Sequence, residues 1–329
     1  ALAYKNIGIA YYMQSNYFEA VQNWNQAIVD FKKINDKAGE ANMLSNLGAI
    51  YFNQADGIKA LEFYLKALKL SEEINDSLRL ATVLMNIGGI YHDKKTEIDN
   101  ALKYALRALP ICEALKDKEA LGTVTANIGE IYFEKGNYDK ALTYLFKSRD
   151  VLDSSENVPS TYILIGRVYA KMDNFGLALT NEFKALEISR NLNAQLDIAR
   201  SLLAIGSTYL DKEDVDNSIK YYLEGIDVAE KIRANVELKG LYEGLSNAYR
   251  KGKNMSGAYK YQKLLLDIKD TLYNTESNKK LSNLMFNYEI DKKEGKISLL
   301  TKDKKIQQQT IEREKLVRNT LILGVAIVM

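Results

Sequence analysis

The sequence predicts an all-α protein, built as a solenoid of about seven two-helix repeats and followed by a long C-terminal helix. Two observations support this prediction. A motif that combines apolar residues, glycine and tyrosine returns about every 40 residues through the first 265 positions. A fixed period of this size is typical of stacked repeats, because one helical hairpin cannot bury its own apolar face. The chain also contains only two prolines, so almost all of it is free to form helices.

Each copy of the motif has two parts, which we place on two successive helices. In the first copy the parts are Tyr4, Ile7, Gly8 and Tyr11, and then Ala20, Trp24 and Ala27. Apolar residues at positions i, i+3 and i+7 line one face of a helix. We expect the small residues where helices approach closely, and Trp24 in the space between units. The later copies carry Gly48 and Tyr51, Gly88 and Tyr91, Gly129 and Tyr132, Gly166 and Tyr169, Gly206 and Tyr209, and Ser246 and Tyr249.

Short polar segments separate the expected helices and fix the register of the repeats independently of the motif. Asn35 and Asp36 follow the first unit, and either of them can cap the next helix. The unit from 129 to 166 is about three residues shorter than the others, and its linker contains Pro159. We therefore expect a slight break in the phase of the stack there, for which a tolerated short linker and a functional hinge are the two explanations.

The motif resembles the tetratricopeptide repeat, whose signature runs W-x2-L-G-x2-Y, then A-x3-F, and then A and P. The resemblance covers roughly residues 1–265, but the closing proline is missing and the period is near 40 instead of 34. The extra residues are expected to lengthen each helix to about 16 residues, or ~24 Å. The resemblance implies a right-handed superhelix whose inner groove holds an extended peptide. A HEAT or armadillo array has a similar period, but is not expected to keep Gly-x2-Tyr followed by Ala.

A row of asparagines is the strongest indication of a binding site. Asn6, Asn46, Asn86 and Asn127 each directly precede the Ile-Gly or Leu-Gly pair of their repeat. The resemblance implies that this position faces the concave groove, where an amide can both donate and accept hydrogen bonds to a peptide backbone. The alternative is that these amides brace adjacent helices. The later repeats carry other residues at this position.

Neighbouring positions are expected to complete the groove. They are Lys5, Tyr12, Phe52, Asn53, Met85, His92, Glu130, Phe133, Arg167 and Lys171. The apolar and aromatic residues of the early repeats suit the side chains of a partner. Arg167 and Lys171 lie one helical turn apart, and either hold an acidic group or form a solvated face.

Residues after the solenoid change character twice. We assign residues 1–268 to the solenoid and 269–318 to a long basic helix whose imperfect heptads allow a coiled coil, so that a homodimer can form through 271–318. Residues 319–329 follow, and from Leu321 onward they are uninterruptedly apolar. We interpret them as the start of a truncated transmembrane helix, which would need ~20 apolar residues in all. A short C-terminal core helix is the alternative. The chain begins with Ala1 inside a motif and is interpreted as a fragment.

The residues that most catalytic sites need are scarce. His92 is the only histidine, Cys112 the only cysteine, and no metal-ligand spacing, phosphate-binding loop or dinucleotide fingerprint occurs. Lys and Arg number 45 against 43 Asp and Glu, which gives no electrostatic reason to bind nucleic acid. We expect no catalysis, cofactor, metal or nucleic-acid partner in this fragment.

The leading functional prediction is the protein- or peptide-binding sensor module of a membrane-anchored bacterial signalling protein, with a two-component sensor kinase as the expected full protein. It depends on the asparagine row and on the junction between the basic helix and the apolar segment; residues 284–300 also resemble the juxtamembrane helix of bacterial tetratricopeptide-repeat sensors. The sequence leaves open whether the repeats are periplasmic or cytoplasmic. The alternatives are a soluble peptide-responsive regulator and a membrane-tethered assembly scaffold.

Overall fold

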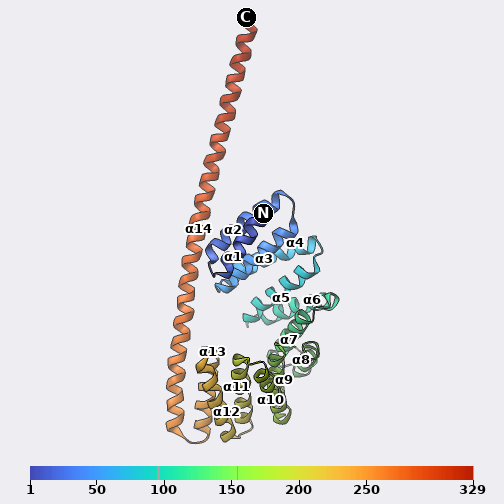
Figure 1. Cartoon of the computed structure of the whole chain (residues 1–329), viewed down its shortest axis with the longest axis vertical. Coiled ribbons are helices and arrows are strands. Elements are labelled where there is room, and N and C mark those ends of the chain that lie inside the picture. The colour runs from blue at the N-terminus through green and yellow to red at the C-terminus, as the bar shows by residue number, and fades with distance from the viewer. Residues whose placement is uncertain (95–96, 154, 329) are drawn as a thin grey trace. The chain divides into compact units, whose positions relative to one another are not determined.

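The computed structural model describes residues 1–94, 97–153 and 155–328, apart from the side chains at 281, 293, 294, 297, 301 and 316–328. The described residues form fourteen helices (Figure 1). The first helices of the successive repeats are α1 (Leu2–Met13), α3 (Lys37–Asn53), α5 (Ser77–Asp93), α7 (Lys118–Glu134), α9 (Val158–Lys171), α11 (Gln195–Asp211) and α13 (Asn235–Lys251). The second helices are α2 (Tyr17–Lys33), α4 (Gly57–Glu73), α6 (Ile98–Leu115), α8 (Tyr138–Val151), α10 (Phe175–Asn191), α12 (Val215–Lys231) and α14 (Met255–Val328).

These helices stack as the predicted all-α solenoid. Each first helix packs against the second helix of its own repeat and against the second helix of the repeat before it. First helices of successive repeats also contact one another, as α3 does with α5 and α9 with α11. The first helices therefore form one layer, in which α3 contacts α5 and α7 to α13 contact one another in turn. Two compact units divide the chain, Ala1–Ser277 and Asn278–Met329, and the solenoid belongs to the first.

The 40-residue period follows from the length of the helices and turns. Most helices have 17 residues, one more than expected, and turns of about three residues join them. In the turn after α2, Asn35 adopts the left-handed conformation with φ of 56°. The Asp36 N–H then donates to the Phe31 carbonyl at 2.9 Å, which satisfies the end of the helix. The Asp36 carboxylate accepts from the Gly39 N–H at 2.8 Å and caps α3. Of the two capping candidates, Asp36 is therefore the N-cap of α3, and Asn35 forms the turn.

The motif glycines lie where two helices of one repeat meet. We call the second-helix residue that packs against each of them the knob residue, which is Trp24 in the first repeat. A Cβ placed on Gly48 would lie 2.8 Å from the ring of the knob residue Tyr64, and one on Gly206 would lie 2.7 Å from the ring of Tyr222. The predicted close approach is therefore present. The motif tyrosines stack on second-helix aromatics, in the pairs Tyr51–Phe63, Tyr91–Tyr104, Tyr132–Tyr144, Tyr209–Tyr221 and Tyr249–Tyr261.

The short unit in the middle of the chain arises from two short helices. Helices α8 and α9 have 14 residues each. Pro159 lies in the first turn of α9, where its missing N–H would have no helical partner in any case. Proline therefore starts this helix without disturbing it, and nothing in this local geometry requires a hinge.

The C-terminal helix is continuous with the last repeat. Helix α14 starts at Met255 as the second helix of the seventh repeat and extends to Val328. Large apolar side chains are exposed along its distal part, including Leu284, Tyr288, Leu300 and Ile311. The dimer through 271–318 stays a prediction, and the heptad residues 281, 297 and 316 lie outside the described side chains.

The predicted membrane anchoring is wrong and is corrected here. Among the residues that the structure describes, no helix has a stretch that is both long and apolar enough to cross a bilayer. The span was predicted from residues 319–329, where neither the side chains of 319–328 nor any part of residue 329 is described.

Candidate functional site

The row of asparagine amides lies on the layer of first helices. Asn46 and Asn86 are half-buried, while Asn6 and Asn127 are exposed. Among the described residues, none of the four side-chain amides has a hydrogen-bond partner. No hydrogen bond of these amides therefore supports the alternative in which they brace neighbouring helices. Each amide keeps its donors and its acceptor available for another molecule.

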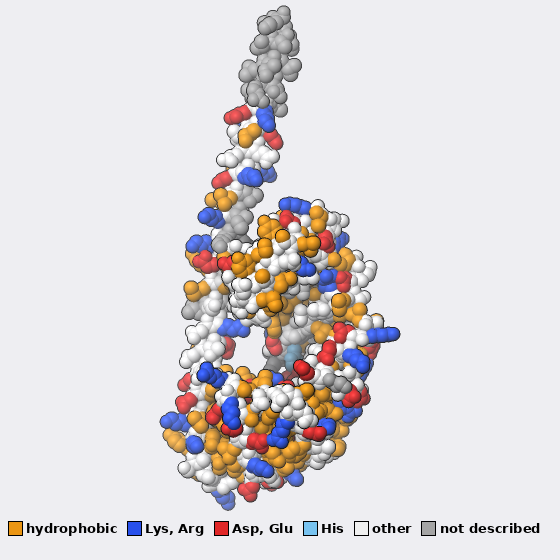
Figure 2. All heavy atoms as spheres, viewed as in Figure 1, with side chains coloured by type: hydrophobic (Ala, Val, Ile, Leu, Met, Phe, Trp, Pro, Cys, Tyr) orange, Lys and Arg blue, Asp and Glu red, His pale blue; other side chains and the backbone are white. Residues whose placement is uncertain are grey.

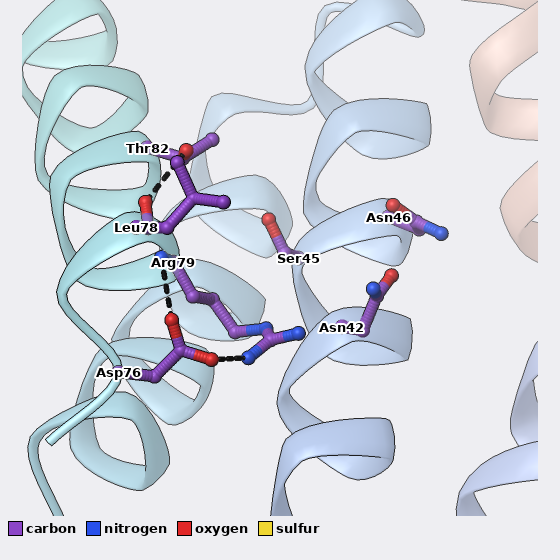
Figure 3. Close-up of a pocket in the computed structure, with 7 residues that line it drawn as sticks. All are labelled: Asn42, Ser45, Asn46, Asp76, Leu78, Arg79 and Thr82. Atoms are coloured by element: carbon purple, nitrogen blue, oxygen red, sulfur yellow. Dashed lines mark hydrogen bonds and ion pairs between the residues drawn. The ribbon is translucent and has the colours of Figure 1, made fainter. Parts of the chain in front are cut away.

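A polar cavity of about 290 Å³ lies between α3 and α5. Figure 3 shows its lining residues, which are Asn42, Ser45, Asn46, Asp76, Leu78, Arg79 and Thr82. Asn42 and Asn46 extend in the same direction from successive turns of α3, and Arg79 reaches toward them from α5. An ion pair with the Asp76 carboxylate holds the Arg79 guanidinium. The cavity thus presents amides, hydroxyls and a fixed cation, which suit the carbonyl and N–H groups of a peptide.

A second cavity of about 150 Å³ lies one repeat further on, between α5, α6 and α7. Four of the residues predicted from the sequence line it together, namely Phe52, Met85, His92 and Asn127. Its other lining residues are Gly88, Gly89, Asp93, Ala101, Ala105, Val124 and Ile131. Val124 and Ile131 are buried, whereas Asn127 and Asp93 are exposed. The cavity therefore has an apolar floor and a partly polar rim, a combination typical of ligand sites.

The remaining predicted residues form small local contacts. The Asn53 side-chain amide donates to the Tyr12 hydroxyl at 3.1 Å, and the carbonyl of the half-buried Lys5 accepts from the Trp24 indole N–H at 3.2 Å. His92 Nε2 lies 3.3 Å from a carboxylate oxygen of Glu134. The Asn53–Tyr12 and His92–Glu134 contacts join adjacent repeats, whereas the Lys5–Trp24 hydrogen bond lies within the first repeat.

The two basic residues of the fifth repeat do not act as a pair. The Arg167 guanidinium carbon lies 5.1 Å from the centre of the Phe133 ring, and its Nη1 lies 3.9 Å from a carboxylate oxygen of Glu130. Arg167 is thus engaged inside the chain, while Lys171 is exposed and has no partner among the described residues. This arrangement favours the solvated face over a site for an acidic group.

One buried acid was missed by sequence reasoning. Glu182 is the knob residue of the fifth repeat, and a Cβ placed on Gly166 would lie 2.5 Å from its side chain. Its side chain is fully buried. The Thr208 hydroxyl donates to Oε1 at 2.8 Å, and Oε2 has no partner among the described residues. Burial raises the pKa of Glu182 to about 8, so the carboxyl is mostly protonated at neutral pH.

Charges on the repeats are mixed in sign. Figure 2 shows basic and acidic side chains interspersed over the visible face of the repeats. Ion pairs join neighbouring repeats, such as Arg107 with Glu72 and Arg190 with Glu224. Within the described part of the chain, no group of three or more His, Cys, Asp or Glu residues could hold a metal. The groove therefore offers a ligand hydrogen bonds, one polar cavity and one cavity with an apolar floor, rather than an electrostatic field of one sign.

Comparisons with known proteins agree with this architecture. A tetratricopeptide repeat family model matches residues 1–73, 39–114 and 79–154, and a second tetratricopeptide repeat model matches residues 199–232. Together the matches cover more than half of the chain. A search of curated protein sequences finds no match.

Solved structures show the same fold. The apo form of RapI has a TM-score of 0.70 at 16% identity, over 83% of this chain and 98% of that one. The apo form of the quorum sensor NprR from B. thuringiensis has a TM-score of 0.64 at 18% identity, over 81% of this chain and 75% of that one. A Rap protein complexed with competence and sporulation factor has a TM-score of 0.59 at 16% identity, over 82% of this chain and 75% of that one. At these identities the likeness concerns the fold alone.

Proposed function

We propose that this chain, which belongs to the tetratricopeptide repeat family, is a regulatory module that binds an extended peptide along its first helices. One observation carries the proposal. Four side-chain amides stand in register on this layer without a hydrogen-bond partner among the described residues, and two of them line cavities. The half-buried Asn46 and Asn86 carry most weight, because a partly desolvated amide that only served the fold would be expected to bond to it.

The geometry suits a peptide better than a small molecule. The two cavities lie in adjacent repeats and share α5 as a wall, so one extended chain can reach both. An extended backbone presents N–H and C=O groups at regular intervals, which a row of amides can match without reading side chains. The cavities would then select the peptide by binding particular side chains.

Two similar structures hold a bound partner, and in one of them this partner is a peptide. The Rap protein noted above is complexed with competence and sporulation factor, and the Rap conjugation regulator of plasmid pLS20 is in complex with the Phr* peptide. A peptide-responsive regulator is favoured over a membrane-anchored sensor kinase for this chain, because the anchoring on which the latter depended is not upheld.

The test uses peptides chosen by the protein itself. A phage-displayed library of random heptapeptides is selected on the full chain, and the enriched peptides are synthesised and titrated by calorimetry. Asn46→Ala combined with Asn86→Ala removes two amides, each worth about 0.5–1.5 kcal/mol in net hydrogen bonding. The expected loss of affinity is about 5- to 150-fold.

Asn191→Ala is the matched control, because Asn191 is exposed at the end of the second helix α10. It should leave the affinity unchanged. Unaltered binding of every enriched peptide to the double variant would refute the groove assignment. Binding without any change in the protein's conformation would favour the scaffold alternative.

A further inference from the structure

The third repeat lacks the large residue that fills the same place in other repeats. The knob residues of the seven repeats are Trp24, Tyr64, Ala105, Leu145, Glu182, Tyr222 and Gln262. Six of these side chains are large, and one is a methyl group. Ala105 lines the 150 Å³ cavity, so the cavity occupies the place of the missing knob residue.

The glycines beside this cavity differ from the other motif glycines in what they face. A Cβ on Gly129 would lie 2.7 Å from Leu145, so that glycine is required by packing. A Cβ on Gly88 would meet nothing closer than 3.6 Å, and one on Gly89 would meet nothing within 4 Å. Glycine in the middle of a helix costs roughly 1 kcal/mol relative to alanine. Gly88 and Gly89 therefore stand in α5 although no neighbouring group requires a glycine at either position. Their effect is to enlarge the cavity.

The dimensions and lining of the cavity point to the chemistry of its occupant. A cavity of about 150 Å³ lined by apolar side chains is large enough to hold a benzene molecule. Met85 and Phe52 line this one, and thioether and ring edges both make favourable contacts with an aromatic ring. The half-exposed Phe52 and the exposed Asn127 belong to the rim, so the cavity opens beside the amide row.

We propose that this cavity is an aryl subsite, in which a phenylalanine side chain of the bound peptide replaces the missing knob residue. The identity of the occupant rests on the proposed function, whereas the affinity of the cavity for a phenyl group does not. The peptide would complete the core of the third repeat with its own ring. Asn127 at the rim would hold the adjacent backbone.

The first experiment uses toluene as the probe, with the methyl groups of Met85 and Ile131 observed by NMR in the full chain. Toluene should cause saturable shifts in the wild-type protein. Ala105→Leu places in the third repeat the knob residue of the fourth, and should abolish these shifts while raising the melting temperature. Lys103→Leu, an exposed position on the same helix, should leave them intact. Gly89→Ala adds a methyl group without a clash and should weaken toluene binding even if Ala105→Leu folds poorly.

The second experiment uses the enriched peptides. Replacing their phenylalanine with alanine should weaken binding to the wild-type protein about 10- to 100-fold, and should have little effect on binding to Ala105→Leu. Toluene shifts that do not saturate, or that survive Ala105→Leu, would overturn the subsite. Peptides that need Asn46 and Asn86 but ignore Ala105→Leu would overturn the peptide occupant and leave the proposed function standing. Saturable toluene binding with no enriched peptide would instead remove the proposed function, and the peptide occupant with it.

Discussion

Replacing Glu182 with glutamine should remove a large pH dependence of stability. The carboxyl is buried between α9, α10 and α11, and its pKa is raised from 4.5 to about 8 because burial penalises the charged form. Between these two values the folded protein holds a proton that the unfolded chain releases. The free energy of unfolding therefore falls as the pH rises through this window, and the contribution is fully present only below pH 4.5.

The magnitude follows from the separation of the two pKa values. At 1.36 kcal/mol per pKa unit, the wild-type protein should lose up to about 4 kcal/mol from this group between pH 5 and pH 9. Glu182→Gln keeps the shape and the acceptor for the Thr208 hydroxyl but does not titrate. The variant should be close to wild type, or slightly less stable, at pH 5, and clearly more stable at pH 9.

Urea unfolding followed by circular dichroism at unit steps from pH 5 to pH 9 measures the difference. Glu187→Gln on the same helix is the control, because Glu187 is exposed and should change stability little at any pH. Stability curves of wild type and Glu182→Gln that run parallel from pH 5 to pH 9 would refute the reasoning. They would mean that the carboxyl reaches water or finds a charged partner.

Three further predictions concern packing and the polar cavity. Gly206→Ala should destabilise the protein by about 1–3 kcal/mol, since the new methyl group would lie 2.7 Å from the Tyr222 ring. Gly89→Ala should instead stabilise the protein by about 0.5–1 kcal/mol. Thermal unfolding of the two variants measures both changes. Asp76→Ala should cost about 1 kcal/mol in urea unfolding through loss of the α5 cap. The same variant releases the Arg79 guanidinium, so it should lower peptide affinity more than its effect on stability predicts, as titration calorimetry would show.

The sequence predicted the fold well because its information is local and repeated. Gly48 and Gly206 each specify a close contact that a single sequence position reveals, and Asn35 with Asp36 specifies a turn. Seven copies of such signals reinforce one another. Most helices are only one residue longer than expected, because the period of the repeat fixes their length.

The candidate site was harder to predict from the sequence, because the smaller cavity arises where a large side chain is absent. Ala105 was not singled out, because alanine is expected at close helix contacts and its effect appears only beside the larger knob residues of the other repeats. A comparison of the knob residues of all seven repeats would have exposed both this gap and the acid at Glu182. Arg79 was missed because its orientation depends on the Asp76 carboxylate. The membrane prediction failed because it extrapolated from residues 319–329 to a membrane-spanning helix, and no such helix is found among the described residues.

The most direct test of the account observes the asparagine side chains themselves. The side-chain amide resonances of Asn6, Asn46, Asn86 and Asn127 can be assigned by single Asn→Gln substitutions in a ¹⁵N-labelled sample of the full chain. When an enriched peptide is added to saturation, the resonances of Asn46 and Asn86 should shift, while that of Asn191 should not. A peptide that binds stoichiometrically and leaves all four amide resonances in place would contradict the central claim, because it would occupy some other surface.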